Sequence, residues 1–518
     1  MEHQRTLFHG VLVQKTGLHV GGGSPSVATE RNVHEAFFRD GSGRLTLRGS
    51  GVKGALAGTV HKLMGAVPGT IRGQKLGIPL DRGRDQSDDG EEFLHSAWIV
   101  HNSHPLEDAP VVMERRTHVG ISHDTGARSD GVLFALETTA AGTRWGFLLE
   151  VDATVCSTDE AYAEAERLAS AALMEWSMGR AWLGGHVARG LGWVELSDAR
   201  VLRVPANSDV LWPDSTVENV WVAASDLKGD WLSLYDFHDT LPAMPRGSHP
   251  AAWSYCAIDI TLEAGMRADT YGCDSVSVGG VEALSALALN PQTGAWQVGG
   301  RRLDLGEEWD EQIPFAITPP LGLGANGAPF LPFIPGSGFR GALRAIMSRI
   351  KRMQGRDVPQ PHDTSVIERG KHAGCAPSKD PSDVEYWFGS LERSARLLVA
   401  DACLSCAPED LAWAATQHHA EDEFAGGVFG GAKFERAAVY AGTFRVRLVL
   451  EVANKDDIEW FLSKEWPVLE RHGRAAAVPL GGAVTRGHGS LPWTEVEIWE
   501  ASAGEPWRRR PSKAGVPT

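Results

Sequence analysis

Apolar side chains recur along the first half of the chain in patterns typical of strands and helices. Residues 10–20 (GVLVQKTGLHV) alternate apolar and polar positions, which predicts a strand. A Gly-Ser-Gly turn at 49–51 then begins a segment with helical periodicity, about four turns long. Strand patterns follow at 96–103 and 133–151, and Gly142 near the middle of the latter predicts a turn between two paired strands.

The first half closes with a helix and a further strand. Residues 157–179 place apolar side chains at helical spacing after Ser157, which is a suitable N-cap, and residues 193–204 alternate as a strand. The order strand, helix, strand, strand, helix, strand predicts a ferredoxin-like α+β domain. The second half repeats this order between 256–265 and 491–500.

Three motifs of the first half return in the second half in the same order. The pairs are 49–56 (GSGVKGAL) with 336–343 (GSGFRGAL), 133–151 with 433–452, and 183–192 (LGGHVARGLG) with 480–489 (LGGAVTRGHG). Their offsets are all roughly 290 to 300 residues, so the chain is a tandem duplication. We expect a first domain over 1–204, a linker over 205–251, a second domain over 252–505 and a tail over 506–518, with loop insertions at 74–92 and 354–383.

The repeated Gly-Ser-Gly turn is a candidate phosphate site. Unpaired backbone N–H groups at a helix N-terminus favour anions, and the helix dipole adds to this. The candidate binding residues are Gly336, Ser337, Arg340 and Arg344, continued by Lys351, and in the first half Gly49, Ser50 and Lys53. Ser337 is expected to cap its helix. The alternative is an ordinary amphipathic helix with a solvated basic face, but packing does not require a basic residue at the same turn position twice.

Two glycine-rich segments carry an arginine in the same place. The candidate residues are Gly184, Gly185, Arg189 and Gly190 in the first half, and Gly481, Gly482, Arg486 and Gly487 in the second. Without side chains, the main chain can closely approach a sugar-phosphate backbone while the arginine supplies charge. The alternative is a glycine turn that packs a helix on a strand, with the arginine in a salt bridge. The repetition favours binding.

Composition narrows the function classes. The chain has 518 residues, a formal net charge of −16 and a pI near 5.6, which argues against nucleic-acid binding over the whole surface but allows a local basic groove. Cys403 and Cys406 form a C-x-x-C pair; buried reduced thiols are favoured over a structural zinc site completed by His362, His372 or Cys375. No apolar run reaches about 18 residues and the N-terminus lacks a signal-peptide core, so we expect a cytoplasmic protein without membrane contact.

The motifs together resemble a known family. The turn-helix IPGSGFRGALR, the loop LGGxVxRGxG and a hairpin ending in AGT are similar to the RAMP superfamily of CRISPR RNA-binding proteins, more narrowly to backbone subunits of type III effector complexes in antiviral defence. The resemblance covers both halves and implies two fused ferredoxin-like (RRM-like) RAMP domains. It implies that the turn-helix and glycine-loop residues bind guide RNA, and that pairing with a complementary target RNA supplies sequence specificity. It also implies other CRISPR effector subunits as partners in a ribonucleoprotein, and long β-hairpins within 115–134 and 418–434 that interrupt the guide–target duplex.

The same resemblance raises the question of catalysis. Target-cleaving members place an acidic residue between the first strand and the turn-helix, where it acts as an endoribonuclease group with a divalent metal such as Mg²⁺. The matching candidates are Asp310 and Glu311 in the second half, and His34 or Glu35 in the first, where the pattern departs from the family aspartate; Asp40 is expected to belong to the turn. Three alternatives stay open: a catalytically inert structural subunit, a guide-processing endoribonuclease that uses His61, and a protein that binds another protein.

Overall fold

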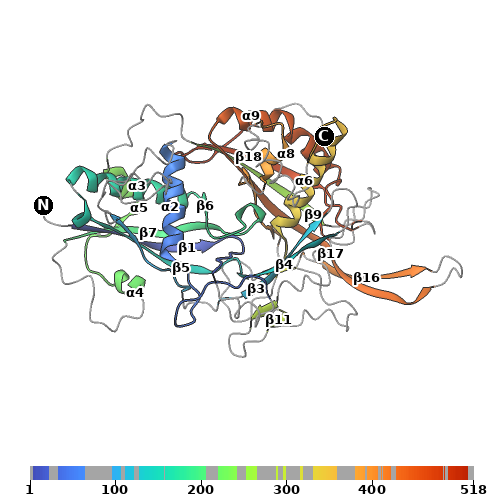
Figure 1. The fold of residues 1–518 in the computed structure, drawn as a ribbon, viewed down its shortest axis with the longest axis horizontal. Coiled ribbons are helices and arrows are strands. Elements are labelled where there is room, and N and C mark those ends of the chain that lie inside the picture. Colours follow the sequence, from blue (N-terminus) through green and yellow to red (C-terminus); the bar gives the residue numbers. More distant parts are fainter. Residues whose placement is uncertain are drawn as a thin grey trace, which may run out of the picture.

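The computed structural model contains two sheet-based bodies side by side, one from each half of the chain (Figure 1). The residues that the structure describes are 4–22, 33–64, 96–106, 111, 113–121, 128–156, 158–205, 220–241, 253–264, 287–289, 296–298, 316–318, 331–358, 380–390, 394–406, 410, 412–421, 428–481, 484 and 488–511.

The first body is a ferredoxin-like domain. Its elements are β1 (Gln4–Gln14), α2 (Gly49–Met64), β2 (Trp98–Val100), β3 (Met113–Ile121), β4 (Arg128–Thr139), β5 (Arg144–Asp152), η1 (Ala153–Val155), α3 (Asp159–Ser177), β6 (Ala181–Trp182), η2 (Val187–Arg189), β7 (Trp193–Pro205), α4 (Val220–Ser225), β8 (Leu232–Ser233) and α5 (Leu234–Thr240). In the described part, the sheet has the order β2-β5-β1-β7-β6, with β8 paired to β7. The pairs are antiparallel, and β1 lies between β5 and β7, as the predicted βαββαβ order requires.

This first sheet is covered on both faces because neighbouring residues of β1 are both apolar. Phe8 packs into the core shared with α2, α3 and α5. Leu7 points to the opposite face, where it packs with Leu202 and against Trp221 of the α4 segment. The stretch predicted to be an irregular linker therefore contains α4, β8 and α5, and these elements pack on the first sheet.

The second body repeats the architecture. Its elements are β9 (Ser254–Ala264), β10 (Leu287–Leu289), β11 (Trp296–Val298), β12 (Ala316–Thr318), β13 (Leu331–Ile334), α6 (Gly336–Met353), α8 (Val384–Phe388), β14 (Leu397–Val399), β15 (Ala402–Leu404), β16 (Ala412–Glu421), β17 (Val428–Val452), α9 (Lys455–Lys464), α10 (Trp466–Arg474), β18 (Trp493–Ser502) and β19 (Arg508–Arg509). The described sheet runs β12-β13-β15-β17-β9-β18-β19, with β14 and β16 also paired to β17. Alternate residues of β9, such as Ile258 and Ile260, join Phe339 and Leu343 of α6 in the core.

A long hairpin leaves each sheet at the predicted place. β3 pairs with β4, and β16 pairs with the first part of β17. The hairpin of β16 and β17 projects from the second body in Figure 1. The predicted turn at Gly142 is present, with a φ of 87°. The predicted pairing across it is wrong: β4 pairs with β3, whereas β5 pairs with β1 and β2. The turn is where the chain leaves the hairpin and enters the sheet.

The two bodies are in contact through apolar and charged groups. Trp182 and Val187 of the first domain pack against Ala257 and Val449 on the face of the second sheet that does not carry α6. Such burial between domains fixes their relative position more firmly than surface ion pairs do. The glycine-rich segment of the first domain follows Trp182 directly, so this contact brings it to the second domain.

Candidate nucleic-acid interface

The turn before α6 is held by a carboxylate. Gly336 N–H donates to Oδ1 of Asp401 at 2.8 Å, and no side chain caps the helix. The prediction that Ser337 caps the helix is wrong, because Ser337 lies within its first turn. In the first half, Oδ1 of Asn102 accepts the N–H of Gly49 at 2.9 Å. In both turns a side-chain oxygen accepts the N–H of the first glycine. The acceptor is an amide in the first half and a carboxylate in the second.

Arg344 of α6 is buried and Arg340 is partly buried, and both make hydrogen bonds to the protein. Arg340 donates a hydrogen bond to the carbonyl oxygen of Phe388, and Nη1 of Arg344 donates to the Gly389 carbonyl at 3.2 Å. Arg344 is 6% exposed. The Nε atoms of both arginines are buried and have no hydrogen-bond acceptor among the described residues. The alternative of a solvated basic face is therefore wrong at these positions, and each guanidinium keeps unused donor capacity.

Two further cations of the repeated motif have protein partners. Lys351 forms a buried ion pair with Glu465 of the α9–α10 corner. Lys53 donates to the Trp98 carbonyl at 3.0 Å, and burial lowers its pKa. Lys53 therefore links α2 to β2, much as Arg340 links α6 to the last residue of α8.

The glycine-rich segment of the first domain lies against the turn of the second. Gly190 has a φ of 96°, and a Cβ built there would lie 2.9 Å from Gly336 Cα and 2.9 Å from Oδ1 of Asp401. Only glycine adopts this conformation easily and leaves room for the other domain. The neighbouring Arg189 guanidinium lies 5.5 Å from the ring centroid of Phe134 on β4.

Arg189, Arg340 and Arg344 form an arginine cluster at the junction of the two domains. Burial, Arg344 and Arg189 together lower the pKa of Arg340 to about 9. Burial also lowers the pKa values of Arg344 and Arg189. Among the described residues, Glu385 offsets part of this effect, and it acts on Arg344. Partly desolvated cations that repel one another are stabilised by an anion, so the cluster is suited to a phosphate group.

The second glycine-rich segment is described in part. Gly482, Arg486 and Gly487 lie outside the described residues. The φ angles of Gly481 (74°) and Gly489 (83°) match those of Gly184 (77°) and Gly192 (85°). The repeated sequence therefore gives the same backbone conformation at both ends of the two segments.

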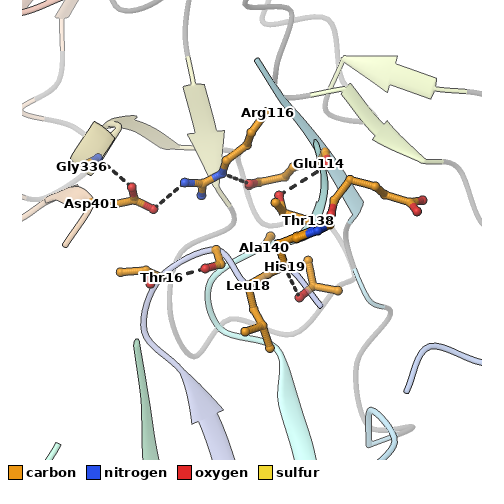
Figure 2. A network of polar contacts seen from close by, with 12 residues as sticks. Thr16, Leu18, His19, Glu114, Arg116, Thr138, Ala140, Gly336 and Asp401 are labelled. Atoms are coloured by element: carbon orange, nitrogen blue, oxygen red, sulfur yellow. Dashed lines mark hydrogen bonds and ion pairs between the residues drawn. The ribbon is translucent and has the colours of Figure 1, made fainter. Parts of the chain in front are cut away.

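Sequence reasoning missed a polar network that joins the domains. Arg116 of β3 donates from Nη1 to Oδ2 of Asp401 at 2.8 Å and from Nε to Oε2 of Glu114 at 3.0 Å. Figure 2 shows Arg116 between the two carboxylates, with Gly336 on the far side of Asp401. Arg116 and Asp401 are 6% and 5% exposed. Neither residue belongs to a repeated motif, so no signal in the sequence singled them out.

The comparison with family models matches this architecture. The RAMP superfamily model matches residues 13–195 and again residues 316–491, well over half of the chain. The chain belongs to the RAMP superfamily. The two matches correspond to the two ferredoxin-like bodies, and membership makes the protein a CRISPR-associated RNA-binding subunit. No curated protein matches the chain.

The catalytic candidates of the first RAMP domain have different surroundings. Nδ1 of His34 accepts the N–H of Ala135 at 2.9 Å, so that nitrogen is occupied. The Glu35 side chain is 55% exposed, and its Oε2 lies 3.2 Å from Nε2 of His19. Both residues are exposed, but His34 has one ring nitrogen engaged by the backbone. Asp40 lies in a tight turn, where hydrogen bonds led by the Ser42 hydroxyl lower its pKa to about 2, which confirms it as a turn residue.

The remaining candidate catalytic and zinc-binding residues lie only partly within the described part of the chain. Asp310 and Glu311 lie outside the described residues, as do His362, His372 and Cys375. Burial raises the pKa of the Cys403 thiol to about 12, so the free thiol is protonated at neutral pH. Among the residues that the structure describes, no group of three His, Cys, Asp or Glu side chains could hold a metal ion, and no helix is long and apolar enough to cross a membrane.

Changing Glu114 to Gln is expected to alter the pH dependence of stability. Burial, only partly opposed by Arg116, raises the pKa of Glu114 from 4.5 to about 6. The folded protein therefore holds a proton that the unfolded chain releases at lower pH, and the free energy of unfolding falls by about 2 kcal/mol as pH rises through this window. Urea denaturation between pH 4.5 and 7 should show that the variant lacks this fall. Parallel curves for variant and wild type would contradict the assignment.

Proposed function

We propose that this protein is a backbone subunit of a CRISPR type III-like effector complex and that it holds one guide RNA across both RAMP domains. Its partners would be guide RNA, complementary target RNA and other effector subunits. Base pairing would supply sequence specificity, and the protein would supply contacts to the RNA backbone.

The observation that carries the proposal is the arginine cluster. Arg189 comes from the first domain, and Arg340 and Arg344 come from the second, yet they act on one another electrostatically. Since the formal net charge is −16, three adjacent, partly desolvated cations favour the binding of an anion there. A phosphate of the guide at this junction would neutralise the repulsion.

The exposed faces of α2 and α6 support an RNA path along both helices. A Cβ built at Gly51, Gly54 or Gly58 of α2 would meet nothing within 4 Å, and the same holds for Gly338 and Gly341 of α6. These glycines leave the helix backbone open near its N-terminal end, where partial positive charge favours phosphate.

The β3–β4 hairpin supports a contact with the guide–target duplex. Val119 and Ile121 lie near the end of β3 and are 48% and 47% exposed. Exposed apolar side chains at a hairpin end are suited to pack against an unstacked base. Cleavage of the target by Asp310, Glu311, Glu35 or His34 with Mg²⁺ remains a prediction from the family resemblance, with a catalytically inert subunit as the alternative.

Binding of a single-stranded RNA of about 30 nucleotides tests the proposal. The purified chain should bind a labelled RNA by fluorescence anisotropy, and log affinity should fall with log salt by about 0.7 for each phosphate neutralised. We expect a slope of about 2 to 3 from the junction and the two turns. No saturable binding at 50 mM salt would overturn the proposal, and so would binding without salt dependence.

A further inference from the structure

We infer that Arg116 and Asp401 form an interdomain link through which the first RAMP domain positions the second domain's Gly336 turn for RNA. The inference rests on the proposed function, and it assigns a positioning role to two residues outside every repeated motif.

Asp401 contacts both domains with its two carboxylate oxygens. Oδ1 accepts the Gly336 N–H at 2.8 Å, and Oδ2 accepts from Arg116 at 2.8 Å (Figure 2). The Gly190 backbone of the first domain also lies close to Oδ1. One carboxylate therefore holds the turn that begins α6 and is itself held by the hairpin of the other domain.

Arg116 is fitted closely into the junction. A Cβ built at Gly17 would lie 2.4 Å from its Nη2, so a larger residue there would displace the guanidinium. On its other side, the guanidinium carbon lies 4.6 Å from the ring centroid of Phe333, two residues before Pro335 and the turn. The arginine thus contacts both the segment that leads into the turn and the carboxylate that holds it.

Comparison with the equivalent turn in the first half shows what the carboxylate of Asp401 adds to holding the turn. Asn102 provides the oxygen for Gly49 N–H at 2.9 Å, so an amide is sufficient to hold the turn. An amide cannot form an ion pair with an arginine. The carboxylate at residue 401 therefore adds one property, the charged link to the first domain, in the half whose α6 carries Arg340 and Arg344.

Asp401→Asn separates the two roles, because it keeps the turn acceptor that Asn102 provides and removes the ion pair. We expect this variant to bind the labelled 30-nucleotide RNA about 10-fold more weakly at 15 °C, with folding verified by circular dichroism. Arg116→Gln should cause a similar loss. The double variant should lose no more RNA affinity than either single variant, because each substitution breaks the same ion pair.

Glu175→Gln is the matched control. Glu175 accepts the N–H of Gly504 at 2.7 Å and pairs with Arg180, so it is a second buried carboxylate that joins the two domains, away from the turn. We expect it to lower the melting temperature without changing RNA affinity. Wild-type affinity in folded Asp401→Asn, or an equal loss in Glu175→Gln, would overturn the positioning role. Absence of RNA binding by the wild type would instead overturn the proposed function, on which the inference rests.

Discussion

Arg340→Met is expected to weaken RNA binding about 30-fold while the protein stays folded. Loss of one charge-assisted contact to a phosphate corresponds to about 2 kcal/mol of binding free energy. The variant also loses the hydrogen bond to the Phe388 carbonyl, which costs about 1 to 3 kcal/mol of stability. Removing the cation relieves its burial and its repulsion with Arg344 and Arg189, which offsets that cost.

Arg508→Met provides the control for this change. Arg508 lies on β19, at the edge of the second sheet opposite β13 and the turn, and its side chain is 74% exposed, so the substitution removes an equal charge away from the junction and from α6. Anisotropy with the 30-nucleotide RNA should give an affinity within about 2-fold of wild type, since a single exposed charge has a small effect. If Arg508→Met weakens binding as much as Arg340→Met, net charge and not the junction determines affinity.

Gly336→Ala is expected to destabilise the second domain by about 3 kcal/mol or more. A Cβ at this position would lie 2.4 Å from the Val399 carbonyl oxygen and 2.7 Å from that of Ala400. Both are backbone atoms of the adjoining strand region, so neither can move aside as a flexible side chain would, and the helix must shift. A displaced turn would also disturb the contact with Gly190 of the first domain.

Gly341→Ala on the same helix is expected to stabilise the second domain. A Cβ at Gly341 meets nothing within 4 Å, and alanine is favoured over glycine inside a helix by about 1 kcal/mol. Urea denaturation followed by circular dichroism should therefore show a lower free energy of unfolding for Gly336→Ala and a higher one for Gly341→Ala. Equal effects at the two positions would show that the turn does not require close approach.

The repeated motifs explain why much of the fold could be predicted from the sequence. Alternation predicted the first strand over 10–20, whereas it lies at Gln4–Gln14, and helical spacing gave the helix Asp159–Ser177, which Thr158 caps in place of the predicted Ser157. The duplication gave two equivalent domains. The positive φ values at Gly184 and Gly481 agree because a glycine conformation is a local property. The hairpin positions came instead from the family resemblance, and the connections from β3 to β4 and from β16 to β17 fall within the expected ranges.

Which strands pair with one another, and which segments pack on a given helix face, was not predictable in the same way. The strands on either side of Gly142 both have strand patterns, but the pattern does not state that one joins a hairpin and the other the sheet. Likewise, the spacing of Arg340 and Arg344 indicated one helix face correctly but left a solvated face as an alternative, whereas both side chains bond to carbonyl groups at the end of α8. Burial of a charged face depends on what packs there.

The sequence by itself determined the duplicated ferredoxin-like domains and the two glycine turns, because local periodicity and local conformation set them. Only the tertiary structure decided that Arg189 joins Arg340, and that Arg116 reaches Asp401 across 285 residues of chain. Contacts between domains depend on the docking of two complete surfaces. Asp401 takes the place that Asn102 has in the first half, and a position at which the two halves differ leaves no repeated pattern from which that docking could be inferred.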